Sequence, residues 1–184
     1  MSRSFLAGVL ALATAACIAS GRGLPEQEGI VNFGRINETV YRGAQPDANG
    51  IKSLQKLGVK LIINLRRPGE SWKHEAEEAQ ACGIQFTNVP LKGLGRPTEA
   101  QVKKILAIIE SAPGPVFVHC EHGCDRTGTI IACWRIQHDH WTSKNALLEA
   151  RRYGMSRLER GMRRYVLDFG SGAGGTLAQG DKFH

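Results

Sequence analysis

Residues 118–128 read Val-His-Cys-Glu-His-Gly-Cys-Asp-Arg-Thr-Gly, and this stretch decides how the rest of the chain is interpreted. Cys120 lies six residues before Arg126, directly after the apolar run 115–118 and directly before a stretch that is compatible with a helix. A strand, a tight loop containing glycine and a helix N-terminus together form an anion cradle. The loop N–H groups converge on an oxyanion, and the helix dipole adds positive potential. The stretch therefore predicts a loop that binds phosphate.

The two reactive side chains of this loop suit chemistry on a phosphate group. Arg126 can bind two phosphate oxygens at once through its planar guanidinium. The same positive environment favours the thiolate of Cys120, which is the nucleophilic form of the side chain. One loop thus supplies a phosphate site and a nucleophile beneath the phosphorus atom.

The pattern His-Cys-x-x-Gly-x-x-Arg-Thr-Gly resembles the signature of the cysteine-dependent protein tyrosine and dual-specificity phosphatases. A bare Cys-x5-Arg arises often by chance, whereas His119, Gly123, Thr127 and Gly128 in their places make the match specific.

Two earlier segments extend the resemblance. Residues 40–46 (Val-Tyr-Arg-Gly-Ala-Gln-Pro) and 62–66 (Ile-Ile-Asn-Leu-Arg), followed by the loop in that order, are similar to the atypical dual-specificity phosphatases of bacteria, fungi and plants. The similarity covers about residues 37–167, which is nearly the whole predicted domain. We interpret both segments as structural supports, and we expect a bacterial member of this superfamily.

The resemblance implies a mechanism. Cys120 attacks phosphorus and forms a cysteinyl-phosphate while Arg126 holds the equatorial oxygens, and Thr127 resembles the family hydroxyl that donates to the sulfur. His119 supports the loop through hydrogen bonds, and Gly123 and Gly128 let the backbone turn and approach closely. Water then hydrolyses the intermediate, so neither a metal nor another cofactor is required. The residues expected to bind phosphate, largely through backbone N–H groups, are Glu121, His122, Gly123, Cys124, Asp125 and Arg126.

The general acid is the departure from the family pattern. Members commonly place an aspartate on a mobile loop some thirty residues before the cysteine, but residues 88–97 contain neither Asp nor Glu. An alkoxide leaving group needs a proton, and general acid catalysis is worth about 10²–10⁴ in rate. Asp125 is the best replacement, since a loop aspartate in that position resembles the myotubularin-type lipid phosphatases. Its alternative role is a salt bridge that shapes the loop, and Glu99 and Asp47 are weaker candidates.

Apolar runs alternate with helical patterns along the chain, which predicts an α/β fold. We expect a central, mostly parallel sheet flanked by helices, with the Cys-x5-Arg loop between a strand and a helix. The expected strands are 39–42, 60–65, 84–89 and 115–118. The expected helices are 48–57 after a cap at Asp47, 71–81, one capped by Thr98, one from the loop to about 138, 143–153 and 157–169.

The N-terminus predicts export. Arg3 precedes nine apolar residues, 5–13, which are too few to span a bilayer, and small residues follow as in a secretory signal peptide. Cleavage after Ala15 competes with a bacterial lipoprotein signal in which Cys17 becomes a lipidated membrane tether. The protein would then be periplasmic or a membrane-anchored lipoprotein; the alternative is a frayed N-terminus of a cytosolic protein. We therefore divide the chain into 1–23, signal and tether; 24–169, phosphatase domain; and 170–184, a disordered glycine-rich tail.

The remaining cysteines do not resemble a disulfide framework. An exported catalytic thiolate is exposed to oxidation, and Cys124 or Cys82 could protect Cys120 through a reversible disulfide. The alternative is that Cys82, Cys124 and Cys133 are small buried apolar residues.

The net charge of +7 leaves the substrate open. Arginines crowd residues 151–164, and Lys92 and Arg96 lie on the loop expected to overhang the site. Such a surface favours anionic substrates or membranes, although solvated helix faces explain most arginine runs. A phosphorylated protein, a phosphoinositide or other anionic lipid, and a small phosphate ester all remain. No nucleic-acid partner is expected, because no binding motif is present.

Two other classes of protein compete with a phosphatase. A pseudophosphatase would keep the phosphate cradle without turnover, as the missing acid suggests. A metal site would use His119, Cys120, His122 and Cys124, with His138 and His140 downstream. Their spacing matches no common zinc pattern, and a metal-bound Cys120 could not attack phosphorus, so no metal is expected.

Overall fold

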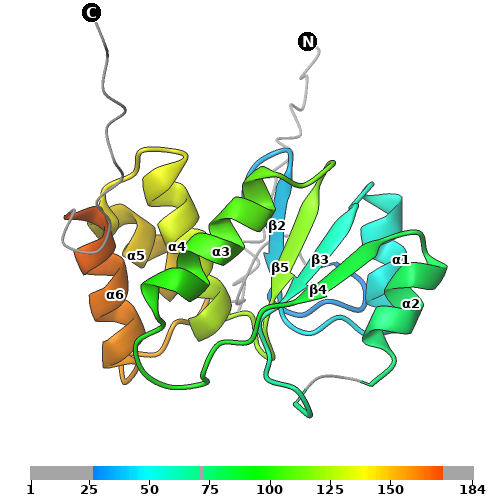
Figure 1. Ribbon diagram of the computed structural model, residues 1–184, viewed down its shortest axis with the longest axis horizontal. Helices are drawn as coiled ribbons and strands as arrows, with labels where there is room; N and C mark the ends of the chain where they lie inside the picture. The colour runs from blue at the N-terminus through cyan, green and yellow to red at the C-terminus, as the bar shows by residue number, and fades with distance from the viewer. Residues whose placement is uncertain (1–26, 71–72, 172–184) are drawn as a thin grey trace, which may run out of the picture.

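A five-stranded sheet forms the centre of the computed structural model, which describes residues 27–70 and 73–171 (Figure 1). The first strand pairs antiparallel with the second, and all the other pairs are parallel. The expected mostly parallel α/β sheet is therefore confirmed. Across the sheet the strands are β1 (Gly34–Arg35), β2 (Val40–Gly43), β5 (Val116–His119), β3 (Leu61–Asn64) and β4 (Gln85–Asn88).

The parallel pairing brings three strand ends to one edge of the sheet. His119, the last residue of β5, lies opposite Gly43 on one side and Asn64 on the other. The chain that leaves β5 is therefore flanked by the chains that leave β2 and β3. In open α/β sheets, ligands bind outside the carboxyl ends of the strands, so this edge positions the Cys-x5-Arg loop for binding.

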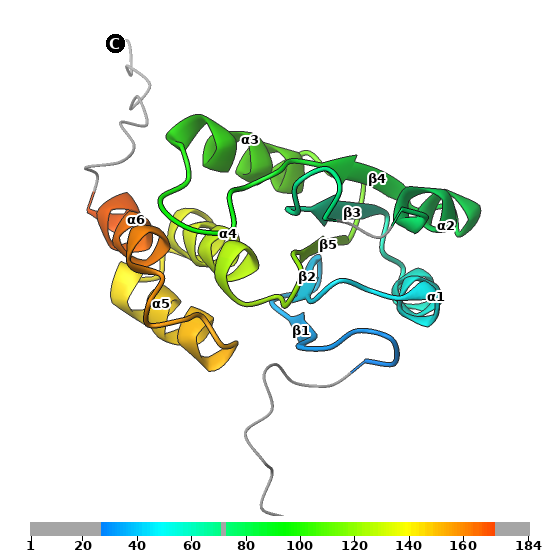
Figure 2. The same cartoon turned by 90° about the horizontal axis from the view of Figure 1, so that it is seen from below.

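Helices cover both faces of the sheet (Figures 1 and 2). Alternate strand residues such as Ile62 and Phe117 pack in the apolar cluster on the face of α1 (Ala48–Lys56) and α2 (Glu75–Ala81). Their neighbours Ile63 and Val118 pack in the larger cluster on the opposite face. Because successive strand side chains point to opposite faces, strands covered on both sides are continuously apolar. The larger cluster is completed by α3 (Glu99–Glu110), α4 (Asp125–Gln137), α5 (Ser143–Arg152) and α6 (Arg160–Gly170).

The two helix caps predicted from the sequence, Asp47 and Thr98, are both confirmed. The Asp47 side chain accepts from Gly50 N at 2.9 Å to begin α1, and Thr98 begins α3 with a capping box to Gln101. The N-cap of α4 is Cys124, which makes no side-chain capping bond. The first N–H groups of a helix lack partners within the helix, so α4 presents uncapped donors. They belong to the helix that follows the predicted phosphate loop.

Several element bounds differ from the sequence prediction: each predicted strand is shifted or shortened by one residue at its ends, and α6 begins at Arg160 rather than at 157. β1 was missed, because a strand of two residues has no periodicity to detect. The second helix begins at Glu75 rather than at 71, and Gly170 is the last residue of α6 rather than the first of the tail. The predicted export signal, Cys17 and residues 172–184 of the tail lie outside the described residues. Within the described part of the chain, no helix is long and apolar enough to cross a membrane.

Candidate active site

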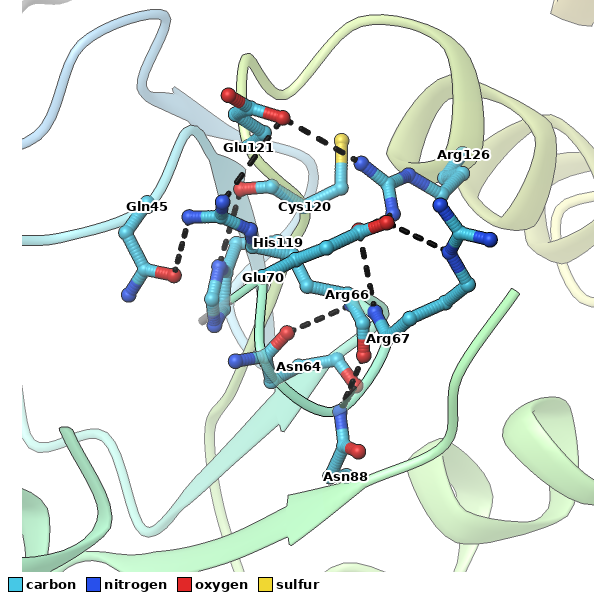
Figure 3. Close-up of polar contacts among 10 residues, drawn as sticks. All are labelled: Gln45, Asn64, Arg66, Arg67, Glu70, Asn88, His119, Cys120, Glu121 and Arg126. Carbon is cyan, nitrogen blue, oxygen red and sulfur yellow. Dashed lines mark hydrogen bonds and ion pairs between the residues drawn. The ribbon is translucent and has the colours of Figure 1, made fainter. Parts of the chain in front are cut away.

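The predicted phosphate loop connects β5 to α4. Cys120 follows directly after β5, and Arg126 lies in the first turn of α4. Both side chains are largely buried, at 3% and 7% exposure. Figure 3 shows the Cys120 sulfur and the Arg126 guanidinium pointing to the same side of the loop. The uncapped start of α4 therefore lies in the same loop as a thiol and a guanidinium, as a phosphate site requires.

A buried cation stands behind the loop. Arg42, on β2, is fully buried, donates from Nη2 to Gly123 O at 2.5 Å and lies 3.9 Å above the centre of the Tyr153 ring. Burial lowers the pKa of Arg42 to about 10, so the guanidinium is still charged at neutral pH. Asn32 also holds the back of the loop, donating from Nδ2 to His122 O at 3.0 Å. The loop is thus braced by side chains from distant parts of the chain.

Backbone contact with the chain after β2 completes the bracing. Gly123 has φ +68, and a Cβ there would lie 2.5 Å from the backbone of Gly43. Gln45 N donates to Glu121 O at 3.1 Å, and Arg66 Nη1 reaches Gln45 Oε1 at 3.3 Å. The segment 40–46 therefore contacts the loop directly, and Arg66 of the segment 62–66 is tied to it through Gln45, as the structural interpretation expected.

His119 and Gly128 lie next to the loop, in positions from which they can support its backbone. The His119 ring is buried, with Nδ1 3.2 Å from Cys120 O. At Gly128 a Cβ would lie 3.2 Å from Met155 Cε, so the missing side chain brings α4 close to the chain after α5. Thr127 is fully buried, and its Oγ1 has no hydrogen-bond partner within the described residues. Its donation to the Cys120 sulfur remains a prediction.

Two carboxylates flank Arg126, and sequence analysis missed one of them. Glu70 Oε2 lies 2.9 Å from Arg126 Nη1, and Glu70 Oε1 accepts from Arg67 Nε at 2.5 Å (Figure 3). The hydrogen bond from Arg126, followed by that from Arg67, lowers the pKa of Glu70 to about 2. Glu121 Oε2 is 3.9 Å from Arg126 Nη2. Glu70 follows β3 in the chain, and its place at the ligand-binding edge was the one available signal.

The expected acid candidates occupy other positions. Asp125 Oδ1 accepts from Ser156 N at 2.7 Å, rather than pairing with a neighbouring arginine. Asp47 caps α1, and Glu99 lies 2.6 Å from Lys103. None of these contacts reaches Cys120 or Arg126. Asp125 stays a prediction because it lies in the loop itself and its second oxygen is outside the Ser156 contact.

Lys92 and Arg96, on the loop that was expected to overhang the site, have different surroundings. Lys92 lines a surface groove together with Arg67 and Glu70, next to the loop. Arg96 instead lies 2.6 Å from Asp168 and stacks 4.9 Å from the Tyr165 ring. The charge of Arg96 is therefore engaged by Asp168 of α6.

The cysteines are placed on different faces. Cys82 packs with the apolar cluster of α1 and α2, on the opposite side of the sheet from Cys120, so its proposed approach to Cys120 is wrong. The Cys124 sulfur lies 3.3 Å from His122 O and accepts from Asn32 at 3.5 Å. Burial raises the pKa of the Cys133 thiol well above its ordinary value, as expected for an inert buried residue. Within the described residues, no three His, Cys, Asp or Glu side chains gather as metal ligands would.

A family model described as "DSP-PTPase phosphatase fused to NAD+ Kinase" matches residues 26–164, which is most of the chain and includes the loop. The chain belongs to the DSP-PTPase family. The resemblance seen in the loop motif is therefore confirmed at the level of the family.

Individual relatives of this DSP-PTPase agree with the family model. The dual specificity protein phosphatase TpbA of Pseudomonas aeruginosa is 32% identical over 127 residues, which cover 67% of this chain and 55% of that protein. The chain thus matches little more than half of that relative's length.

Solved structures agree in fold. The crystal structure of a cysteine-to-serine variant of P. aeruginosa TpbA in complex with pTyr has a TM-score of 0.67 and 26% identity, covering 81% of this chain and 90% of that one. The crystal structure of PTPMT1 in complex with PI(5)P has a TM-score of 0.66 at 23% identity, covering 76% and 94% of the two chains, and is similar in fold alone.

Replacing Gly123 by alanine should disrupt the loop more than replacing Gly58, which is the matched control. Both glycines have positive φ, +68 and +77, but a Cβ at Gly58 would meet nothing within 4 Å. Gly58→Ala should cost about 1 kcal/mol of unfolding free energy, the strain of a left-handed alanine. Gly123→Ala adds a clash with backbone and should cost about 1–3 kcal/mol more. Urea unfolding measures both variants, and equal losses would contradict the role assigned to the Gly43–Gly123 contact.

Glu70→Gln should lower kcat/KM on an aryl phosphate by about tenfold, because Arg126 loses the charged acceptor that orients it. Glu70 has a depressed pKa of about 2, so its ion pairs are fully present above the ordinary value of 4.5 and are lost only as the pH falls toward 2. The pH–rate profiles of parent and variant above about pH 5 should therefore have the same shape. Glu77→Gln, at an exposed carboxylate paired with His74, is the control. Unchanged kcat/KM in Glu70→Gln would show that Arg126 is held without it.

Proposed function

We propose that this DSP-PTPase hydrolyses phosphate monoesters through a cysteinyl-phosphate intermediate. The observation that carries the proposal is the placement of Cys120 and Arg126 in one braced loop at the uncapped N-terminus of α4. Helix donors, a bidentate guanidinium and a buried cation behind the loop all favour an anion at this position.

Two displacements at phosphorus make up the reaction. In the first, the Cys120 sulfur forms a bond to phosphorus, the bond to the ester oxygen breaks, and the leaving oxygen takes a proton from Asp125, the proposed acid. Arg126 Nε and Nη2 remain as donors to the equatorial oxygens, because Glu70 engages Nη1. In the second, water attacks phosphorus and gives a proton back to the Asp125 carboxylate, the sulfur leaves as thiolate, and inorganic phosphate forms. The buried Thr127 hydroxyl, in the residue after Arg126, is the proposed donor to the departing sulfur.

Phosphotyrosine in a protein is the substrate that we propose. Two arginines at the mouth are already paired, since Arg67 contacts Glu70 and Arg66 Nη2 lies 3.8 Å from Glu121 Oε2. Paired cations offer little attraction to a second phosphate, and the two carboxylates repel one, so the site suits a single phosphate group. The pTyr complex of TpbA, at 26% identity, supports the same choice.

Phosphate release under reducing conditions tests the reaction. The purified protein should hydrolyse p-nitrophenyl phosphate and a phosphotyrosine peptide, and Cys120→Ser should abolish both activities while leaving the unfolding midpoint within error. Turnover of a phosphotyrosine peptide should exceed that of a water-soluble phosphoinositide; the reverse order would overturn the proposed substrate. If the folded parent binds vanadate or phosphate without turnover, the protein is the alternative, a pseudophosphatase.

Asp125→Asn tests the proton donor. If Asp125 protonates the leaving oxygen, the variant should lose about 10²–10⁴ in kcat on alkyl phosphates and far less on aryl phosphates with good leaving groups. The ratio of the two losses is the deciding measurement, because loss of the bond to Ser156 alone would lower both equally. Glu99→Gln and Asp47→Asn are the controls, since their carboxylates are engaged on α3 and α1. Equal losses on both ester types would exclude Asp125 as the acid.

A further inference from the structure

A buried polar network lies beneath the nucleophile, formed by three elements of the fold. Asn64 ends β3, Glu75 begins α2 and His119 ends β5, and each is at most 1% exposed. Glu75 Oε1 forms an ion-pair contact with His119 Nε2 at 2.8 Å without the alignment of a hydrogen bond, and Glu75 Oε2 accepts from Asn64 Nδ2 at 2.6 Å. Asn64 Oδ1 in turn accepts from Arg66 N at 2.7 Å. The network therefore ties α2 to the residue that precedes Cys120.

The contacts of the imidazole set its proton count. His119 Nδ1 is 3.2 Å from Cys120 O, and a backbone carbonyl can only accept, so Nδ1 carries a proton. His119 Nε2 is 2.8 Å from a carboxylate oxygen, in an ion-pair contact rather than an aligned hydrogen bond. A bare nitrogen lone pair at that distance from a charged oxygen would be repelled, so Nε2 carries the second proton. Turning the ring by 180° would place carbon atoms against both acceptors, which supports this assignment of the ring nitrogens. The Glu75–His119 pair therefore holds one proton more than a neutral imidazole beside a carboxylate.

The burial of Glu75 has a free-energy cost that a purely structural role does not explain. Burial of a carboxylate costs free energy unless it is paired and hydrogen-bonded, and Glu75 is fully buried, whereas Glu77 on the same helix is 76% exposed in its side chain. The buried carboxylate has two partners, His119 and Asn64, both at the ends of strands that flank the loop. The charge of Glu75 is thus placed against the loop rather than against solvent.

We propose that Glu75 is a positioning residue that keeps the His119 ring doubly protonated, so that His119 donates a charge-assisted hydrogen bond to the Cys120 carbonyl. Hydrogen bonds from a charged donor are roughly twice as strong as those between neutral groups. The stronger bond holds the Cys120 backbone in the orientation that directs its sulfur into the phosphate cradle. Its effect on catalysis rests on the phosphatase reaction proposed above, whereas the proton count does not.

Glu75→Gln is a closely matched test, because the amide can keep the contacts of the carboxylate while the His119 ring carries one proton fewer. The glutamine oxygen can accept from Asn64, and its NH₂ group can donate to His119 Nε2 if the ring is neutral. The structural network is therefore retained while the second ring proton is lost. Glu77→Gln, on the exposed side of α2, removes a carboxylate without touching His119.

Nitrogen-15 NMR of the histidine ring near neutral pH reads the proton count directly. The parent protein and Glu77→Gln should show protons on both ring nitrogens of His119, and Glu75→Gln should show one, on Nδ1. A parent spectrum with a single ring proton would overturn the proposal. The parent spectrum decides this point alone, even if Glu75→Gln does not fold and even if the protein proves to lack turnover.

Steady-state kinetics test the consequence. Glu75→Gln should lower kcat on an aryl phosphate by about tenfold or more, the size expected for weakening one charge-assisted bond, with KM changed much less. Glu77→Gln should leave kcat unchanged. Wild-type kcat in a folded Glu75→Gln that has lost the second ring proton would overturn the positioning role. A parent without turnover, but with both ring protons, would contradict the proposed phosphatase reaction alone.

Discussion

In a loop that binds phosphate, several positive groups converge on one point, and the protein itself must keep them there when no anion is bound. The N–H groups at the start of α4, the Arg126 guanidinium and the buried cation Arg42 all contribute to this potential. Like charges and aligned dipoles repel one another, so the arrangement persists only if other parts of the fold over-determine the loop. The rest of the structure depends on this constraint.

The fold meets the constraint by surrounding the loop with strand ends. His119 lies between Gly43 and Asn64 in the sheet, so the chains leaving β2 and β3 flank the loop. Gly123 packs directly against the Gly43 backbone, where a side chain would not fit. Parallel pairing is what makes this possible, because it brings the carboxyl ends of neighbouring strands to one edge. The pairing of β2, β5 and β3 thus positions this one short loop.

Carboxylates balance the positive charge at two distances from the phosphate site. Glu70 lies at the mouth and contacts Arg126, and its depressed pKa keeps it ionised throughout the neutral range. Glu75 lies beneath the loop and contacts His119 out of reach of solvent. The first carboxylate orients the arginine that binds phosphate, and the second acts through the histidine next to the nucleophile. Anion binding at this site therefore depends on acidic residues as well as on basic ones.

The features that could be predicted from the amino-acid sequence are those of short range. The spacing of Cys120 and Arg126, the caps at Asp47 and Thr98, and the apolar runs of β3 and β5 depend on neighbouring residues, so pattern and propensity predict them. The two-residue strand β1 and the engagement of Arg96 by α6 gave no such pattern.

Which distant side chains meet at the loop could be seen only from the three-dimensional arrangement of the strands and helices. Glu70 and Glu75 belong to a charged stretch that predicts nothing more than solvated loop and helix. Each became part of the site because strand order placed β3 beside β5. A motif encodes the chemistry of one loop locally, whereas the carboxylates and the cation that surround that loop come from segments far away in the sequence, whose positions depend on the sheet topology.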